Sequence, residues 1–260
     1  MNEPATTFKS VKNYFEETGR LSDFTFRFFR EVFSPPFEWK EMFRQAYLLG
    51  YKSFFLVGMT AFIMGLVLTL QARPTMIEFG AESWIPSMVG ISIIREIGPV
   101  ITAMVCAGKV ASSIGAELGS MKVTEQIDAM EVSGTNPFKF LVVTRVVAIT
   151  LMLPLLTIMG DFISLLGSWL VEYAKGDVTL ILYFDLVFES LEFVDVIPSF
   201  IKTFFFGFII GIVGCYKGYF SSKGTAGVGS AANSAVVMST ILLFAMDFIA
   251  VLISDIFYDL

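Results

Sequence analysis

Five ionisable residues lie inside apolar stretches of the sequence, and they are the strongest candidates for a functional site. They are Arg95, Glu96, Asp161, Lys202 and Asp247. A charge buried in a membrane is costly, so such a residue usually has a partner or a functional role. Three are acidic and two are basic, which leaves a formal charge of −1. We therefore expect them to pair inside a helix bundle, with Lys202 bound to Glu96 and Asp247 in the same network. Two roles stay open: structural ion pairs, or direct contact with a lipid.

The two aspartates are also the pair that an intramembrane aspartyl-type hydrolase would need. Asp161 follows Gly160 and Asp247 follows Met246, whereas that class of enzyme uses Gly-x-Gly-Asp and Tyr-Asp contexts. A secondary transporter is a second alternative, but such folds usually contain inverted repeats, and no two segments of this chain look alike. We therefore favour a protein that is not an enzyme.

Several other kinds of site are excluded by composition. The chain has no His and only two Cys, so we expect neither a His/Cys metal site nor a disulfide framework. A net charge of −6 argues against a nucleic-acid partner. A phosphate-binding loop is also missing, because Lys109 is followed by Val110 rather than Ser or Thr. We expect no cofactor on this chain, so any ATP and Mg²⁺ would bind to another subunit.

The elements that position these residues are long apolar segments. Hydrophobic residues make up 55% of the chain and charged residues 16%, with a mean hydropathy of +0.72. A membrane-spanning helix needs about 20 apolar residues, and five stretches qualify. They are residues 53–72, 86–108, 146–171, 197–216 and 235–256. The sequence therefore predicts an all-α integral membrane protein with five transmembrane helices.

The orientation follows from the positions of Lys and Arg near the ends of the spans. Residues 1–52 contain eight of them, the loop from Lys109 to Arg145 four, and the loop after Tyr216 two. The opposite side has only Arg73 and Lys175 among many acidic residues. We expect the N-terminus to be cytoplasmic and the C-terminus to be on the outer, periplasmic side.

An amphipathic helix precedes the first span. At 100° per residue, Phe24, Phe28 and Val32 lie in one broad apolar arc, and Arg27 and Arg30 lie in the opposite one. This pattern is typical of a helix in the membrane interface, and the alternative is a helix packed on a soluble partner. Pro35-Pro36 ends the helix, and a second short helix at about 37–49 leads into the first span.

The loop between the second and third spans contains another short amphipathic helix. Val123, Ile127 and Met130 recur at helical spacing, with Glu125 and Asp128 off that stripe. This helix either joins two spans or docks on a cytosolic partner that delivers force.

The chain resembles the MlaE-type permeases of MCE-associated phospholipid ABC transporters. The resemblance rests on GAELGSMKVTEQIDAMEVSGTNP (115–137), the preceding REIGPVITAMVCAGKVASSIG (95–115), and the later IKTFFFG and MDFIA. It extends over nearly the whole chain, and the segment from Glu117 to Asp128 is its most specific part.

The resemblance implies a division into interfacial and elbow helices at 1–50 and a five-span permease domain at 51–260. It implies a homodimer in the bacterial inner membrane, a cytosolic ABC ATPase with an optional small regulatory subunit, and an MCE-domain protein on the outer face. Phospholipid would be the cargo, and its movement would maintain outer-membrane lipid asymmetry. The residues implied near the lipid pathway are Arg95, Glu96, Lys202 and Asp247. Those implied in coupling to the ATPase are Glu117, Met121, Val123, Glu125, Ile127 and Asp128.

Overall fold

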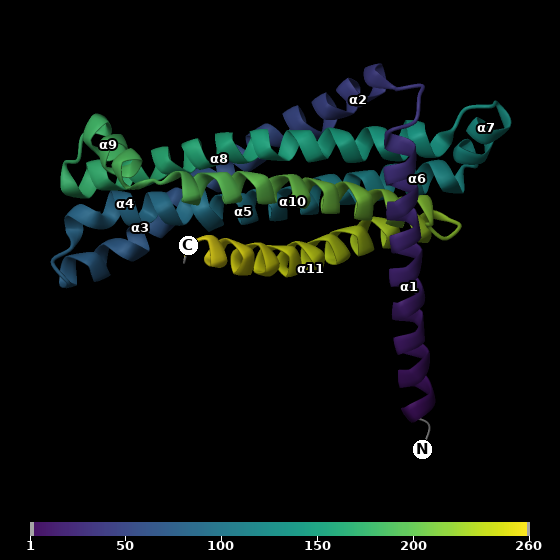
Figure 1. The fold of residues 1–260 in the computed structure, drawn as a ribbon, viewed down its shortest axis with the longest axis horizontal. Coiled ribbons are helices and arrows are strands. Elements are labelled where there is room, and N and C mark those ends of the chain that lie inside the picture. Colours follow the sequence, from purple (N-terminus) through teal and green to yellow (C-terminus); the bar gives the residue numbers. More distant parts are fainter. Residues whose placement is uncertain (1–2, 259–260) are drawn as a thin grey trace.

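The protein is an all-helical bundle, seen in a computed structural model that describes the backbone of residues 3–258 and the side chains of residues 16–256 (Figure 1). No strand occurs in the described backbone. A chain in lipid must satisfy its backbone polar groups internally, and a helix does so within one segment. The predicted fold class is therefore confirmed.

Five helical runs are long and apolar enough to cross a membrane in the described part of the chain, and each contains one predicted span. They cover Trp39–Glu78, Glu82–Val123, Phe138–Gly176, Phe193–Tyr219 and Thr225–Ile256. The first run comprises α2 (Trp39–Ala46), the π-turn η1 (Tyr47–Tyr51) and α3 (Lys52–Glu78). The short helix predicted at 37–49 therefore continues into the first span, and the proposed boundary at residue 50 falls within this run.

The second run is the most interrupted. After the 3₁₀ turn η2 (Glu82–Trp84) it comprises α4 (Ile85–Ser92), the π-turn η3 (Ile93–Ile97), α5 (Gly98–Cys106), the π-turn η4 (Ala107–Ala111) and α6 (Ser112–Val123). A π-turn inserts one extra residue into a helix and often marks a functional site. Arg95 and Glu96 lie on η3.

The remaining elements complete the bundle. The short helix α7 (Gln126–Val132) precedes the π-turn η5 (Phe138–Val143) and α8 (Thr144–Gly176). Then come α9 (Leu180–Ser190), α10 (Phe193–Tyr219) and α11 (Thr225–Tyr258). In Figure 1, α7 lies at the end of the bundle where α1 (Glu3–Val32) crosses it, and α9 lies at the opposite end.

The centre of the bundle is formed by α8, which packs on α3 and α10. Close approach of α3 and α8 depends on a glycine, because a Cβ at Gly65 would lie 1.8 Å from the carbonyl oxygen of Ser164. Gly207 of α10 meets α8 in the same way, with the carbonyl oxygen of Ile149 2.8 Å from its ideal Cβ position. Small residues at such crossings let membrane helices pack through their backbones.

The structure corrects the prediction that Phe24 and Phe28 of α1 lie in the membrane interface. Each is only 4% exposed. The Phe24 ring packs edge-on against Phe138 and Tyr216, with centroids 4.9 and 5.6 Å apart, and Val32 is partly buried against the same core. The reason is that the apolar arc contains two stripes, and the one with Phe24, Phe28 and Val32 faces protein. The second stripe, with Phe26 and Phe33, is exposed and is the one that could meet lipid.

Candidate functional site

Three of the predicted intramembrane charges meet at one point. Lys202 Nζ of α10 lies 2.6 Å from Glu96 Oε2 and 3.1 Å from Asp247 Oδ1 of α11. The Lys202 side chain is only 5% exposed, so its charge depends on these two carboxylates rather than on water. The predicted pairing of Lys202 with Glu96, and its extension to Asp247, is confirmed.

The fourth charge, Arg95, lies beside this cluster. Its Nη1 is 3.9 Å from Asp195 Oδ1, at the start of α10. Asp195 also accepts a hydrogen bond from the backbone N–H of Glu192 as part of a capping box. Ser199 of α10 donates to the carbonyl oxygen of Ile94 at 2.5 Å. These contacts fix α10 against η3, which carries both Arg95 and Glu96.

Lys202 also forms part of the wall of a groove between α10 and α11. The groove has a volume of about 520 Å³. Its other lining residues are nearly all apolar and come from the two helices: Phe193, Val194, Ile197, Pro198, Ile201, Phe205, Met246, Ala250, Ile253 and Ser254. A long apolar wall with one buried cation suits a ligand that joins an anionic group to hydrocarbon chains.

Asp161 is the charge that does not join the cluster. Its Oδ1 is buried and has no hydrogen-bond partner among the described residues. The carboxyl group lies against the backbone of Gly98, where a Cβ would be 1.7 Å from Oδ1. Asp247, in contrast, is bound to Lys202. Asp247 is thus held by a cation and Asp161 by no described partner, which does not favour a shared proteolytic centre.

The predicted coupling segment is a bent hairpin rather than one amphipathic helix. Val123 ends α6, and Glu125 adopts a left-handed conformation with φ of 58° before α7 begins. Lys122 Nζ lies 2.7 Å from Asp128 Oδ1 and ties the two helices together. Val123 and Ile127 therefore do not share a helix, which corrects the prediction of a continuous stripe.

The prediction that Ile127 contacts the ATPase directly is also wrong. It is 1% exposed and belongs to the main apolar cluster of the bundle, against which Met121 and Met130 pack in part. Glu125 and Asp128 are exposed. The surface that α7 offers to a partner is therefore mainly acidic, and its apolar stripe anchors it to the spans.

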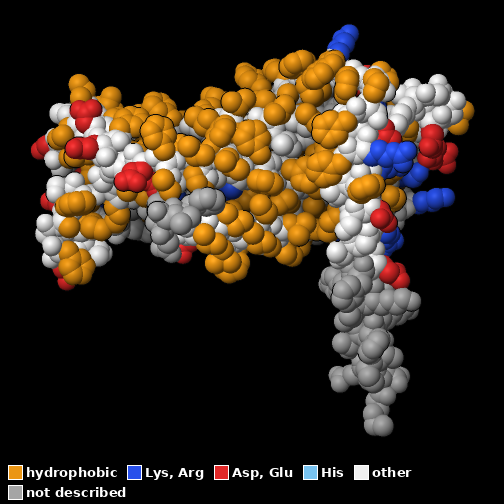
Figure 2. All heavy atoms as spheres, viewed as in Figure 1, with side chains coloured by type: hydrophobic (Ala, Val, Ile, Leu, Met, Phe, Trp, Pro, Cys, Tyr) orange, Lys and Arg blue, Asp and Glu red, His pale blue; other side chains and the backbone are white. Residues whose placement is uncertain are grey.

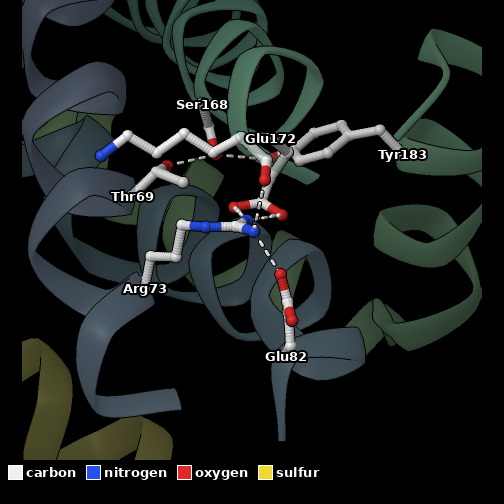
Figure 3. Close-up of polar contacts among 7 residues, drawn as sticks. Thr69, Arg73, Glu82, Ser168, Glu172 and Tyr183 are labelled. Atoms are coloured by element: carbon white, nitrogen blue, oxygen red, sulfur yellow. Dashed lines mark hydrogen bonds and ion pairs between the residues drawn. The ribbon is translucent and has the colours of Figure 1, made fainter. Parts of the chain in front are cut away.

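A second buried polar cluster, which the sequence analysis missed, lies at the α9 end. Arg73 of α3 donates from Nη1 to both carboxylate oxygens of Glu172, each at 2.8 Å, and also binds Glu82 (Figure 3). In the same view, Ser168 lies between Thr69, at 2.5 Å, and the hydroxyl of Tyr183 on α9, at 2.6 Å. This cluster joins α3, α8 and α9. The sequence contains a sign of this cluster, because Thr69 and Arg73 are four residues apart, as are Ser168 and Glu172, and residues at this spacing lie on one face of a helix.

Comparison with known proteins agrees with this architecture. The family model described as permease MlaE matches residues 42–253. A probable ABC transporter permease protein of Rickettsia prowazekii is 40% identical over 250 residues, covering 96% of this chain and 95% of the relative. One from Synechocystis is 36% identical over 204 residues, 78% of each chain. The chloroplastic protein TRIGALACTOSYLDIACYLGLYCEROL 1 of Arabidopsis thaliana is 33% identical over 211 residues, 81% of this chain and 60% of that protein.

The family model covers most of the chain, and the Rickettsia relative aligns with nearly its whole length. The matched region contains the charge cluster, the groove between α10 and α11, and the α6–α7 hairpin. The chain belongs to the MlaE family of permeases.

Proposed function

We propose that this chain is the membrane-spanning subunit of an ATP-driven phospholipid transporter. The observation that carries the proposal is the position of Lys202, a buried ammonium group in the wall of an otherwise apolar groove. A phospholipid has the matching division, with an anionic phosphate next to acyl chains. One relative is named after trigalactosyldiacylglycerol, a membrane lipid, which supports lipid as the class of cargo.

The charge cluster would select and release the lipid by exchange of partners. A phosphate that enters beside Lys202 can replace Asp247, the more distant of its two carboxylate partners. The Asp247 side chain is 19% exposed, and it would turn toward water when the phosphate takes its place. Arg95, one-third exposed in the same region, supplies a second cation for the phosphate. When the phosphate leaves, the carboxylates take up Lys202 again, so the ammonium is never left buried without a counter-charge.

The energy would come from a separate cytosolic ABC ATPase that binds ATP and Mg²⁺. The names of the relatives as ABC transporter permeases support this partner, and the chain itself has no phosphate-binding loop. The acidic face of α7, with Glu125 and Asp128, is the surface that would dock on the ATPase. In this arrangement the chain is non-catalytic, and a small regulatory subunit would bind to the ATPase.

The protein would lie in the inner membrane of a bacterial cell, with its α7 end facing the cytoplasm. On the face drawn in Figure 2, Lys and Arg gather at the α7 end, while the α9 end carries acidic side chains, which is the asymmetry expected of a cytoplasmic α7 end. The start of the chain would then be cytoplasmic and the end of α11 periplasmic; the last two residues lie outside the described part. An MCE-domain protein would bind the outer face and exchange lipid that maintains outer-membrane asymmetry.

A second copy of the chain would pack along α11. In its most apolar stretch only 11% of α11 is buried, compared with 67% for the third span, which contains α8. Its exposed side chains include Ile241, Phe244 and Phe248. In a homodimer joined there, each groove between α10 and α11 would lie beside the interface.

Purification of the complex in mild detergent, followed by partner identification and lipid mass spectrometry, tests the proposal. We expect an ATPase and bound phospholipid with the parent chain. Lys202→Met combined with Glu96→Gln and Asp247→Asn leaves no member of the cluster charged, and it should lose the phospholipid while it keeps the ATPase. Lys223→Met, in an exposed loop, should keep both. Isolation of the parent chain without an ATPase, or equal lipid content in the triple variant, would overturn it.

A further inference from the structure

A separate pocket lies where the linker between α1 and α2 meets the start of the third span. Its volume is about 120 Å³. The walls are mostly apolar and include Val32, Met42, Val143 and Val147. Two charged side chains, Glu38 and Lys139, also line it. None of the lining residues is shared with the groove between α10 and α11.

Lys139 places a buried positive charge in this pocket. It is 7% exposed, and its ammonium group donates to the carbonyl oxygen of Ser34. The ammonium also lies 5.7 Å from the centre of the Phe37 ring. No carboxylate pairs with Lys139 among the described residues. A buried ammonium that lacks a counter-charge favours the binding of an anion.

Glu38 places a negative charge in the same pocket. It precedes α2, yet its side chain does not cap that helix. Within the described part of the chain, its carboxylate forms no ion pair, including none with Lys139. The pocket therefore contains two opposite charges that are not in direct contact with each other, which suits a ligand that itself carries both charges.

The surroundings of the pocket place it at a membrane surface. Two aromatic side chains in its wall, Phe37 and Trp39, are exposed. Aromatic residues are enriched where the lipid headgroups meet the hydrocarbon. The pocket lies at the α1 end of the first and third spans, so its neighbours outside the protein are lipids of one leaflet.

We propose that this pocket binds one phospholipid with an ethanolamine headgroup from the leaflet at the α7 end. The phosphate pairs with Lys139, and the ammonium pairs with Glu38 beside the rings of Phe37 and Trp39, which attract cations. An acyl chain then lies over Val143 and Val147. This site holds the elbow of the chain to the membrane and does not require that its lipid be cargo.

Trp39 gives a direct reporter for this site. The chain has three Trp, so Trp84→Phe with Trp169→Phe leaves Trp39 alone. The matched control, Trp39→Phe with Trp169→Phe, leaves Trp84, which is exposed at the α9 end. Each full-length chain is placed in phosphatidylcholine bilayers that contain brominated phosphatidylethanolamine, phosphatidylglycerol or diacylglycerol, and quenching gives relative binding. At Trp39 we expect phosphatidylethanolamine to be preferred by about fivefold, the size of one ionic contact at a membrane surface. At Trp84 we expect no preference.

Two substitutions separate the two charges. Glu38→Gln should abolish the preference for phosphatidylethanolamine over phosphatidylglycerol and should keep the preference for phospholipid over diacylglycerol. Lys139→Met should abolish the preference for phospholipid over diacylglycerol. Lys40→Met, an exposed control beside the pocket, should change neither preference. Quenching at Trp39 that does not depend on the headgroup, or a preference unchanged by Glu38→Gln, would overturn the proposal even if Lys139→Met failed to fold.

Discussion

Arg145 and Glu117 form an ion pair that joins α8 to α6, with Arg145 Nη2 2.8 Å from Glu117 Oε1. The two partners are in unequal surroundings, because the Arg145 side chain is 2% exposed and that of Glu117 is 50% exposed. Nη1 of Arg145 donates to the carbonyl oxygen of Leu141, and its Nε is buried without a described partner. Glu117 is therefore the only described counter-charge of a buried cation, at the point where the second span meets the α6–α7 hairpin.

This inequality predicts which partner is more costly to lose. Glu117→Gln leaves the Arg145 charge buried and unpaired, so it should destabilise the protein by about 1–3 kcal/mol. Arg145→Met removes the buried charge and leaves Glu117 in contact with water, so it should cost less. Thermal unfolding of both purified variants in detergent measures the order. Greater loss of stability in Arg145→Met would contradict the assignment of Glu117 as the essential counter-charge.

The Lys202 cluster predicts a different order, because one cation serves two carboxylates. Lys202→Met leaves Glu96 and Asp247 near each other without a cation, and should cost about 3–5 kcal/mol. Glu96→Gln keeps the pair with Asp247 and should be tolerated best. Combining Glu96→Gln with Lys202→Met still leaves one carboxylate unpaired, so full recovery should also need Asp247→Asn. Unfolding temperatures of the series test this order, and a stable Lys202→Met protein would contradict the network.

The acidic face of α7 predicts a loss of ATPase binding on charge reversal. Glu125→Lys should weaken binding by at least about tenfold, because like charges across an interface cost more than about 1.4 kcal/mol. Asp128→Lys should also loosen the hairpin, since it removes the pair with Lys122. The amount of ATPase that co-purifies measures the effect, with Glu189→Lys on the exposed side of α9 as control. Full retention of the ATPase by Glu125→Lys would exclude this docking face.

The two stripes of α1 predict unequal effects of two similar substitutions. Phe28→Ala removes a ring buried against Phe208, with centroids 5.5 Å apart, and should cost about 3–5 kcal/mol. Phe33→Ala removes an exposed ring and should change protein stability little. Thermal unfolding compares them directly. A cysteine at position 28 should also react slowly with a water-soluble maleimide, and fast labelling would show that α1 is not docked.

The spans and the central ion pair could be predicted from sequence for simple reasons. Each span is a run of apolar residues longer than a soluble helix needs, and a Lys in such a run requires a carboxylate at similar depth. The side of α1 that faces protein could not be predicted, since both lipid and protein interior accept Phe. Hydrophobicity marked the whole arc as apolar, and it could not show that Phe24 and Phe28 face protein while Phe26 and Phe33 are exposed.

The cluster around Arg73 was missed for a related reason. Near the end of a span, Arg73 looks like any basic residue that marks a membrane boundary. Its buried charge is paired with Glu172, about a hundred residues later in the chain. Such a contact requires knowledge of which helices are neighbours. The bend at Glu125 was missed because a left-handed backbone conformation is uncommon outside glycine, and the apolar spacing across it still matched a continuous helix.

The π-turn η4 determines which sides of the second span Glu96 and Glu117 face. It lies between Glu96, which faces Lys202, and Glu117, which faces Arg145. One residue turns a helix by about 100°, so the extra residue of η4 sets the angle between these two faces. Loss of a single residue there would leave length, composition and hydropathy almost unchanged, yet it would turn one carboxylate away from its cation. An ungapped alignment of this span with a relative that lacks the π-turn would therefore pair residues on different sides of the helix.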